Sequence, residues 1–343
     1  MKHSVFQNLS ATAEPLLTPA GTRRDFFRRS VAAAGAALAG GLSGQRLLQA
    51  AVPSTAIVDV RLPIPPRLQR EEFSGYCGEC SIQQSALYYG SYVSEYACRS
   101  IIDPSQKSQY LVGVHERKVL SALRLTYTLF DHGKVARPEY QGYFVWIKQQ
   151  LRLKRPVMIV CFVSDLKDPE YDHIMLATGF TSIDSTAYHA SDKLYFNDNF
   201  SKAVIGRTAS LLNDNRKMLA NGSQFDFCIP TDNDFGCAIT GIQDISGEAL
   251  PVRMELNRND EPNLIQKKAA VSLSAVVTIS RLQVGRAYAL YRYNNCLDVP
   301  VQKYAQSKYS TVVKFVAKKT TETFPATILS SGVAIFRCLP VGL

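Results

Sequence analysis

The chain has little of what several common classes of protein require. Its 343 residues include five scattered histidines and a single C-x-x-C pair, so a metal site of cysteine and histidine ligands is not predicted, and no cofactor is indicated. The formal charge is +10, but lysine and arginine form no block with interleaved aromatic residues. Nucleic acid is therefore not an expected partner. No internal repeat or low-complexity tract follows the first 50 residues.

The cysteines lack the spacing of a disulfide scaffold, although eight is an even number and disulfides are permitted in an exported chain. They stand at Cys77, Cys80, Cys98, Cys161, Cys228, Cys237, Cys296 and Cys338. Cys161 lies within the apolar run 157–163, which predicts a buried strand, and a free cysteine in such a strand acts as a small hydrophobic residue. The pairing of the other cysteines stays open.

Residues 1–51 have the features of a targeting segment. The run TRRDFFRR at 22–29 precedes a stretch of small and apolar residues at 31–42 that is too short to span a membrane comfortably. The arginine pair before two phenylalanines resembles a twin-arginine export signal. That resemblance implies the twin-arginine export machinery as a partner, cleavage near 49–52, and a periplasmic or secreted protein. No other segment is a transmembrane candidate.

The remaining chain predicts an α+β fold in two parts. In the first, 52–235, a short extended arm precedes helices packed on an antiparallel sheet; in the second, 236–343, short strands separated by turns suggest a small sandwich-like β domain. The hydrophobic fraction of 46% supplies enough apolar material for two cores. Helices are expected at 78–92, 95–102, 115–128 and 140–153, and strands at 156–163, 173–179, 193–197, 225–229, 237–242, 250–256, 270–280, 287–293, 311–317 and 332–336.

The run GYCGECSIQ at 75–83 is the strongest candidate for the site of a reaction. Glycines on both sides of Cys77 indicate a tight turn, and the apolar spacing that follows predicts a helix beginning at the cysteine. Unpaired backbone N–H groups and the helix dipole stabilise a thiolate at that position, so we expect an exposed nucleophile of lowered pKa. Cys80, one turn along, is the alternative nucleophile.

A nucleophilic cysteine needs a base and a group that orients the base. His173 follows a polar turn and begins an apolar strand that ends in a glycine, and the next predicted strand ends in the run NDN at 197–199. If the two strands are adjacent and antiparallel, Asp198 can accept a hydrogen bond from the His173 ring. Asn197 is a further candidate for an orienting or oxyanion-binding group.

This order of motifs resembles the papain-like cysteine peptidases, and more narrowly the branch of the double-glycine leader peptidases. The matching runs are Tyr-Cys-Gly at 76–78 and Tyr-Tyr-Gly at 88–90, followed by His173 and Asp198. The resemblance covers roughly 68–235, about half of the chain. It implies a papain-like fold and a triad of Cys77, His173 and Asp198 that hydrolyses peptide or amide bonds.

The sequence departs from the leader peptidases in two respects. Glu71 stands where the family has an oxyanion-hole glutamine, six residues before the nucleophile, and Gln69 is the nearest substitute. The transporter to which leader peptidases are fused is absent. Compared with papain itself, the run CGEC at 77–80 would make Cys80 the nucleophile, but Ser81 stands where papain has tryptophan.

We therefore expect an exported thiol hydrolase acting on a peptide or protein substrate. Within this class, amidase activity on cell-wall peptides and acyl transfer are open. Two alternatives lie outside the class: an inactive papain-like domain that binds a partner at the cell surface, and an oxidoreductase that uses a Cys77–Cys80 pair.

Overall fold

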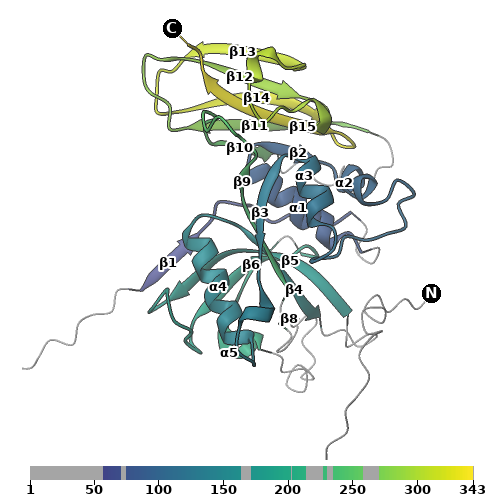
Figure 1. The fold of residues 1–343 in the computed structure, drawn as a ribbon, viewed down its shortest axis with the longest axis vertical. Coiled ribbons are helices and arrows are strands. Elements are labelled where there is room, and N and C mark those ends of the chain that lie inside the picture. Colours follow the sequence, from purple (N-terminus) through teal and green to yellow (C-terminus); the bar gives the residue numbers. More distant parts are fainter. Residues whose placement is uncertain are drawn as a thin grey trace, which may run out of the picture. The chain divides into compact units, whose positions relative to one another are not determined.

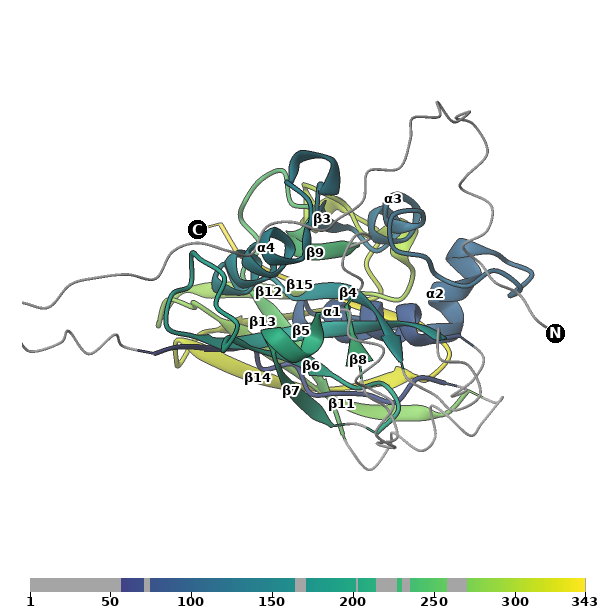
Figure 2. The same ribbon diagram turned by 90° about the horizontal axis from the view of Figure 1, so that it is seen from below.

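The structure is a computed structural model that describes residues 57–70, 75–163, 171–201, 203–213, 227–229, 235–257 and 270–342. These residues belong to one compact unit, Ser54–Leu343. Their fold is α+β, with mostly antiparallel sheets (Figure 1, Figure 2). The leader expected at 1–51 and its cleavage region lie outside the described residues.

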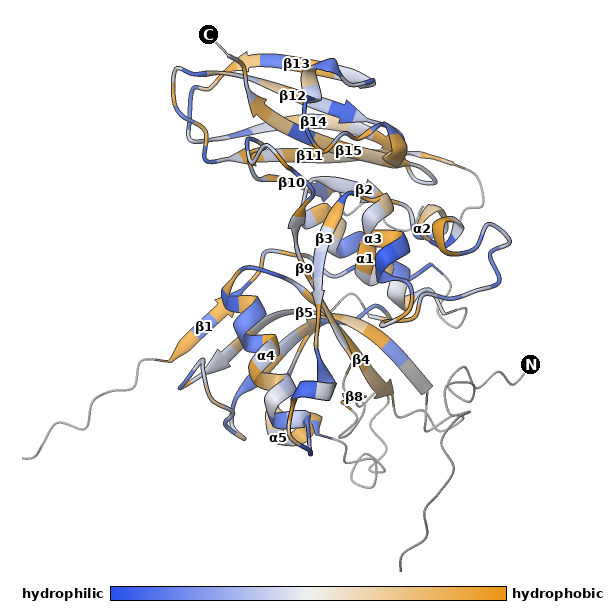
Figure 3. Cartoon of the chain, in the orientation of Figure 1, coloured by the Kyte–Doolittle hydropathy of each residue, from blue (hydrophilic) through white to orange (hydrophobic). Residues whose placement is uncertain are grey.

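The larger sheet has eight strands in the order β3-β9-β4-β5-β6-β7, with β1 paired to β5 and β8 paired to β4, all antiparallel. Every residue of β4 except Phe162 is buried, which explains why its sequence is continuously apolar instead of alternating (Figure 3). The strands are β1 Val58–Arg61, β3 Leu125–Leu129, β4 Val157–Val163, β5 Tyr171–Ser182, β6 Lys193–Asn197, β7 Val204–Thr208, β8 Phe227–Cys228 and β9 Gly236–Ile242.

Helices pack against this sheet, with α1 in contact with β5, and α4 in contact with β1, β4 and β5. The helix α2 begins as predicted, because the Ser94 hydroxyl accepts a hydrogen bond from the Ala97 N–H at 3.0 Å and caps its N-terminus. The helices are α1 Cys77–Tyr88, α2 Glu95–Ile102, α3 Glu116–Ala122, α4 Tyr140–Arg152 and α5 Ala209–Leu212, with 3-10 turns η1 His132–Lys134, η3 Cys296–Asp298 and η4 Tyr304–Gln306.

The helix predicted over 115–128 is wrong in its second half. The helix α3 ends at Ala122, Arg124 takes the left-handed conformation with φ 56°, and β3 begins at Leu125. The apolar spacing continues across this break, but the β-branched and aromatic run at 126–128 favours a strand once β9 is available to pair with it.

Two further sheets lie in the C-terminal part of the chain. One has the order β10-β11-β14 and the other β13-β12-β15-β2, and side chains of both contribute to a second core that includes Met254, Val277, Leu290 and Phe336. This is a sandwich arrangement. The strands are β2 Ser91–Val93, β10 Val252–Leu256, β11 Ser272–Ser280, β12 Ala287–Tyr293, β13 Thr311–Val316, β14 Thr321–Leu329 and β15 Val333–Pro340.

The two parts of the chain share strands across the boundary expected at residue 235. The strand β9 follows that boundary but lies between β3 and β4 in the larger sheet. Conversely, β2 lies far upstream and pairs with β15 of the C-terminal sheet. The chain therefore crosses between the two sheet systems more than once.

No helix in the described part of the chain is long and apolar enough to cross a membrane.

Candidate functional site

Cys77 is the first residue of α1, as the turn and spacing predicted. The turn depends on Gly75, whose φ of +73° favours glycine and whose missing side chain leaves room for the Gln109 amide. Gly78 is equally constrained, because a Cβ there would lie 2.7 Å from the Tyr110 ring. The thiol is not exposed as expected: Cys77 has 7% of its surface accessible.

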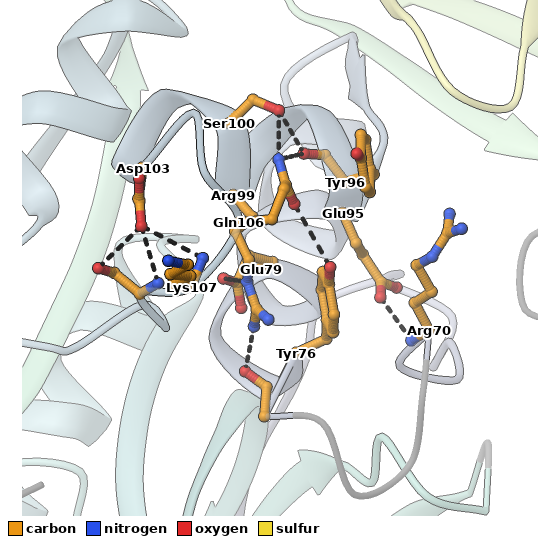
Figure 4. Close-up of polar contacts among 12 residues, drawn as sticks. Arg70, Tyr76, Glu79, Glu95, Tyr96, Arg99, Ser100, Asp103, Gln106 and Lys107 are labelled. Carbon is orange, nitrogen blue, oxygen red and sulfur yellow. Dashed lines mark hydrogen bonds and ion pairs between the residues drawn. The ribbon is translucent and has the colours of Figure 1, made fainter. Parts of the chain in front are cut away.

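A buried ion pair fixes the start of α1 to α2 (Figure 4). The Glu79 carboxylate lies 2.8 Å from Nε of Arg99, and both side chains are almost fully buried. The Arg99 guanidinium also donates to the Gly75 carbonyl and stacks 3.4 Å from the centre of the Tyr76 ring. Glu79, which separates the two thiols in sequence, therefore anchors the helix start.

Cys80 faces the protein interior. It is fully buried, its thiol donates to the Arg67 carbonyl at 3.5 Å, and its sulfur accepts from Nε2 of Gln84 at 3.4 Å. Burial and the nearby negative charge of Glu95 raise its pKa well above the usual range. These contacts make Cys80 a packed neighbour of Cys77. All eight cysteines are free thiols in this structure.

His173 lies on β5, opposite Cys161 of β4. Its ring is fully buried and stacks on the Phe200 ring, with 4.3 Å between ring centres and 13° between planes. Burial alone lowers its pKa from 6.5 to about 3. The imidazole is therefore neutral at pH 7.

Asp198 closes the turn between β6 and β7. One carboxylate oxygen accepts from the Phe200 N–H at 2.9 Å, and the other accepts from the N–H and the hydroxyl of Ser201. These bonds use the side chain locally, as is typical of an aspartate that forms a turn. Among the described residues, no hydrogen bond joins Asp198 to His173. Asp198 instead fixes the loop that holds Phe200 against the His173 ring.

Asn199 connects Cys77 to the strand of His173. Its Nδ2 donates to the Cys77 carbonyl at 3.1 Å and to the carbonyl of Ile174, the neighbour of His173, at 3.0 Å. The Ser81 hydroxyl reaches the same two carbonyls at 2.9 and 3.3 Å. Asn199 was not a predicted site residue, although the run NDN at 197–199, which has two amide side chains, indicated that an amide could lie at the site.

The other two predicted polar residues belong to the same buried network. Nδ2 of Asn197 donates to the Ile64 carbonyl at 3.0 Å and to Oε1 of Gln84 at 2.6 Å. Nε2 of Gln84 in turn donates to Oδ1 of Asn199 at 2.9 Å. The Gln69 backbone N–H donates to the Asn199 carbonyl at 2.9 Å, and the Gln69 side chain is buried. Glu71 lies outside the described residues.

The expected lowering of the Cys77 pKa is wrong for this structure. Burial raises the pKa of the thiol to about 12, and hydrogen bonding to the Ile174 and Gly78 backbone offsets only part of that effect. The removal of the sulfur from water thus raises this pKa by more than the helix N-terminus lowers it. No hydrogen bond between described residues joins the Cys77 sulfur to the His173 ring. At pH 7 the pair consists of a neutral thiol and a neutral imidazole.

Among the described residues, no group of three or more histidine, cysteine, aspartate or glutamate side chains could hold a metal ion. Comparison with known proteins finds no protein-family model that matches the chain and no similar curated protein. The fold and site together define an α+β protein in which a helix begins at a buried cysteine and packs against a histidine-bearing strand.

Proposed function

We propose that the protein is an exported papain-like thiol hydrolase, most simply a peptidase, with Cys77 as nucleophile and His173 as base. The observation that carries the proposal is the pair of Asn199 hydrogen bonds to the carbonyls of Cys77 and Ile174. They hold the start of α1 beside the strand of His173, which is the arrangement that a cysteine nucleophile and its base require. Export rests on the arginine-rich leader.

In the proposed reaction, the Cys77 sulfur attacks the carbonyl carbon of a peptide bond while the thiol proton passes to a ring nitrogen of His173. Backbone N–H groups at the start of α1 donate hydrogen bonds to the developing oxyanion. His173 then gives the proton to the departing amine, which leaves a thioester on Cys77. Water, deprotonated by His173, hydrolyses the thioester and restores the thiol.

The neutral pair requires a side-chain movement before attack. No hydrogen bond between described residues joins the thiol to the ring, and catalytic hydrogen bonds often tighten only when substrate is bound. In this proposal, Asp198 positions the loop that holds Phe200, and Asn199 positions the start of α1. The buried side chain of Cys80 packs α1 against the protein interior. The complete burial of Cys80 speaks against a reversible Cys77–Cys80 disulfide as the main activity.

Hydrolysis of a fluorogenic peptide library by the full chain tests the proposal. Cys77→Ala abolishes hydrolysis, because the nucleophile is lost. Cys296→Ala is the matched control, since it removes an equally buried thiol from η3, and it retains the activity. Full activity in Cys77→Ala would disprove the assignment of the nucleophile.

A catalytically inactive binding domain is the second candidate, favoured by the burial of Cys77 and its raised pKa. A peptidyl vinyl sulfone, which reacts with a cysteine activated by a base, separates the two functions. The hydrolase is modified at Cys77, and His173→Gln prevents the modification. An inactive domain leaves Cys77 unmodified after prolonged incubation, as measured by the mass of the intact protein.

A further inference from the structure

The sandwich has a strongly basic stretch of sequence. Residues 281–319 contain eight lysine and arginine residues but a single carboxylate, that of Asp298. The basic residues are separated along the chain, and four of them lie in two loops. One loop, 281–286, joins β11 to β12, and the other, 317–320, joins β13 to β14. The arrangement of these loops therefore decides whether the four charges act together.

Backbone hydrogen bonds hold the two loops side by side. The Leu282 N–H donates to the Thr320 carbonyl at 3.0 Å, and the Gly285 N–H donates to the Ala317 carbonyl at 2.8 Å. The Ala317 N–H in turn donates to the Arg286 carbonyl at 3.0 Å. The first loop turns at Gly285, whose φ of +84° favours glycine. Together, 281–286 and 317–320 form one end of the sandwich, which we call the basic tip.

The basic tip presents positive charge to solvent. Its four cationic side chains are all exposed: Arg281, Arg286, Lys318 and Lys319. Neither loop contains a carboxylate. Glu322, which follows the second loop, accepts from the backbone N–H groups of Lys318 and Lys319 at 2.8 and 3.0 Å and contributes one negative charge. The cations of the tip thus outnumber the neighbouring carboxylate four to one.

Two exposed valines lie among these charges. Val284, between Arg281 and Arg286, has 64% of its surface accessible, and Val316, the last residue of β13 before the second loop, has 56%. Single exposed apolar residues are common on protein surfaces. Apolar side chains surrounded by basic residues are different, because both kinds of group gain free energy at an anionic membrane.

We propose that the basic tip binds the surface of a membrane that contains anionic phospholipids. Its four cations attract the lipid phosphate groups, and Val284 enters the boundary between headgroups and acyl chains. A soluble polyanion would match the charge but would leave Val284 in water, so the valine favours the membrane. Binding at the tip involves neither Cys77 nor His173 and does not depend on the hydrolysis proposed above.

Co-sedimentation of the full chain with lipid vesicles tests the proposal. We expect binding to vesicles of phosphatidylcholine mixed with phosphatidylglycerol, and much weaker binding to phosphatidylcholine alone. Each basic residue at an anionic surface contributes about fivefold to binding, so Lys318→Gln combined with Lys319→Gln weakens it about tenfold or more. The matched control combines Lys303→Gln with Lys308→Gln, which removes the same charge from exposed sites between β12 and β13, and it retains binding. The basic leader is the same in all variants, so the differences between them report the tip.

Tryptophan fluorescence tests whether the tip enters the lipid. The added emission of Val284→Trp, relative to the unsubstituted protein, moves to shorter wavelength when anionic vesicles are added. The matched control Val276→Trp, at a 46% exposed position of β11, gives no such change. Val284→Ser weakens vesicle binding severalfold and leaves binding of polyphosphate, a soluble polyanion, unchanged.

Three results would overturn the proposal. The first is equal binding to vesicles with and without phosphatidylglycerol. The second is an equal loss of binding in the two lysine double variants, which would assign the attraction to overall charge and not to the tip. The third is an unchanged emission of Val284→Trp, or unchanged vesicle binding of Val284→Ser, which would show that the tip binds polyanions without entering a membrane.

Discussion

Asn199→Ala gives the sharpest test of the buried network. The substitution removes hydrogen bonds to the carbonyls of Cys77 and Ile174 and one from Nε2 of Gln84. Each bond contributes about 1 kcal/mol net, and a buried group left without a partner costs about 1–3 kcal/mol. The Ser81 hydroxyl still reaches both carbonyls, so the Gln84 amide loses most. We expect the free energy of unfolding to fall by about 3 kcal/mol.

Urea denaturation of the full chain, followed by tryptophan fluorescence, measures this loss. Asn294→Ala is the matched control, because the Asn294 amide also makes two side-chain hydrogen bonds but is exposed to solvent. We expect the control to change the free energy of unfolding by less than about 0.5 kcal/mol. A loss below about 1 kcal/mol for Asn199→Ala would refute the argument that this amide fixes α1 to β5.

Two further predictions concern buried titratable side chains. The pKa of His173 falls from 6.5 in the unfolded chain to about 3 in the folded protein, so stability is retained above pH 6.5 and lost as the pH falls toward 3, by about 1.4 kcal/mol per unit. In acid titrations of the free energy of unfolding, His173→Gln flattens this decline. A slope equal to that of the unsubstituted protein would contradict the reasoning. Glu79→Gln removes the carboxylate that pairs with the buried Arg99 guanidinium and lowers stability by about 3–5 kcal/mol in urea denaturation. Asp131→Asn, in an exposed ion pair with Lys134, changes stability far less, because solvent screens that pair. Similar losses for these two variants would show that the Glu79–Arg99 pair is not an anchor.

The sequence predicted those elements whose signals are local. The turn at Gly75, the start of α1 at Cys77 and the limits of α2 each depend on neighbouring residues, and the structure confirms them. The strand β4 was equally clear, because a strand buried on both faces reads as one apolar run.

Two of the strands that were not predicted, β2 and β14, pair with strands that are distant in the sequence. The strand β2 has three residues and exists through its pairing with β15. The strand β14 alternates between exposed and partly buried residues and contains Pro325, which weakened its signal.

The sequence predicted the residue types of the candidate site more accurately than the burial and hydrogen bonding of those residues. The helix start of Cys77 was correct, but its burial could not be read from local spacing, because distant segments such as β5 cover it. Asp198 was expected to orient His173, yet the neighbouring amide, Asn199, makes the long-range contacts. In a run such as NDN, three polar residues share one turn, and only the tertiary fold decides which of them points inward.

The pairing of β2 with β15 has a consequence for biosynthesis. The Tyr92 hydroxyl donates to the Ser330 carbonyl, and Ser91–Val93 pairs with Val333–Ile335. These contacts cannot form on the ribosome until Val333–Ile335 has emerged, so β2 waits for its partner strand while some 240 further residues are synthesised. Contacts between such distant residues also slow folding. A nascent chain shortened at residue 235 would lack β9 as well, and would leave β4 and β3 without the strand that lies between them.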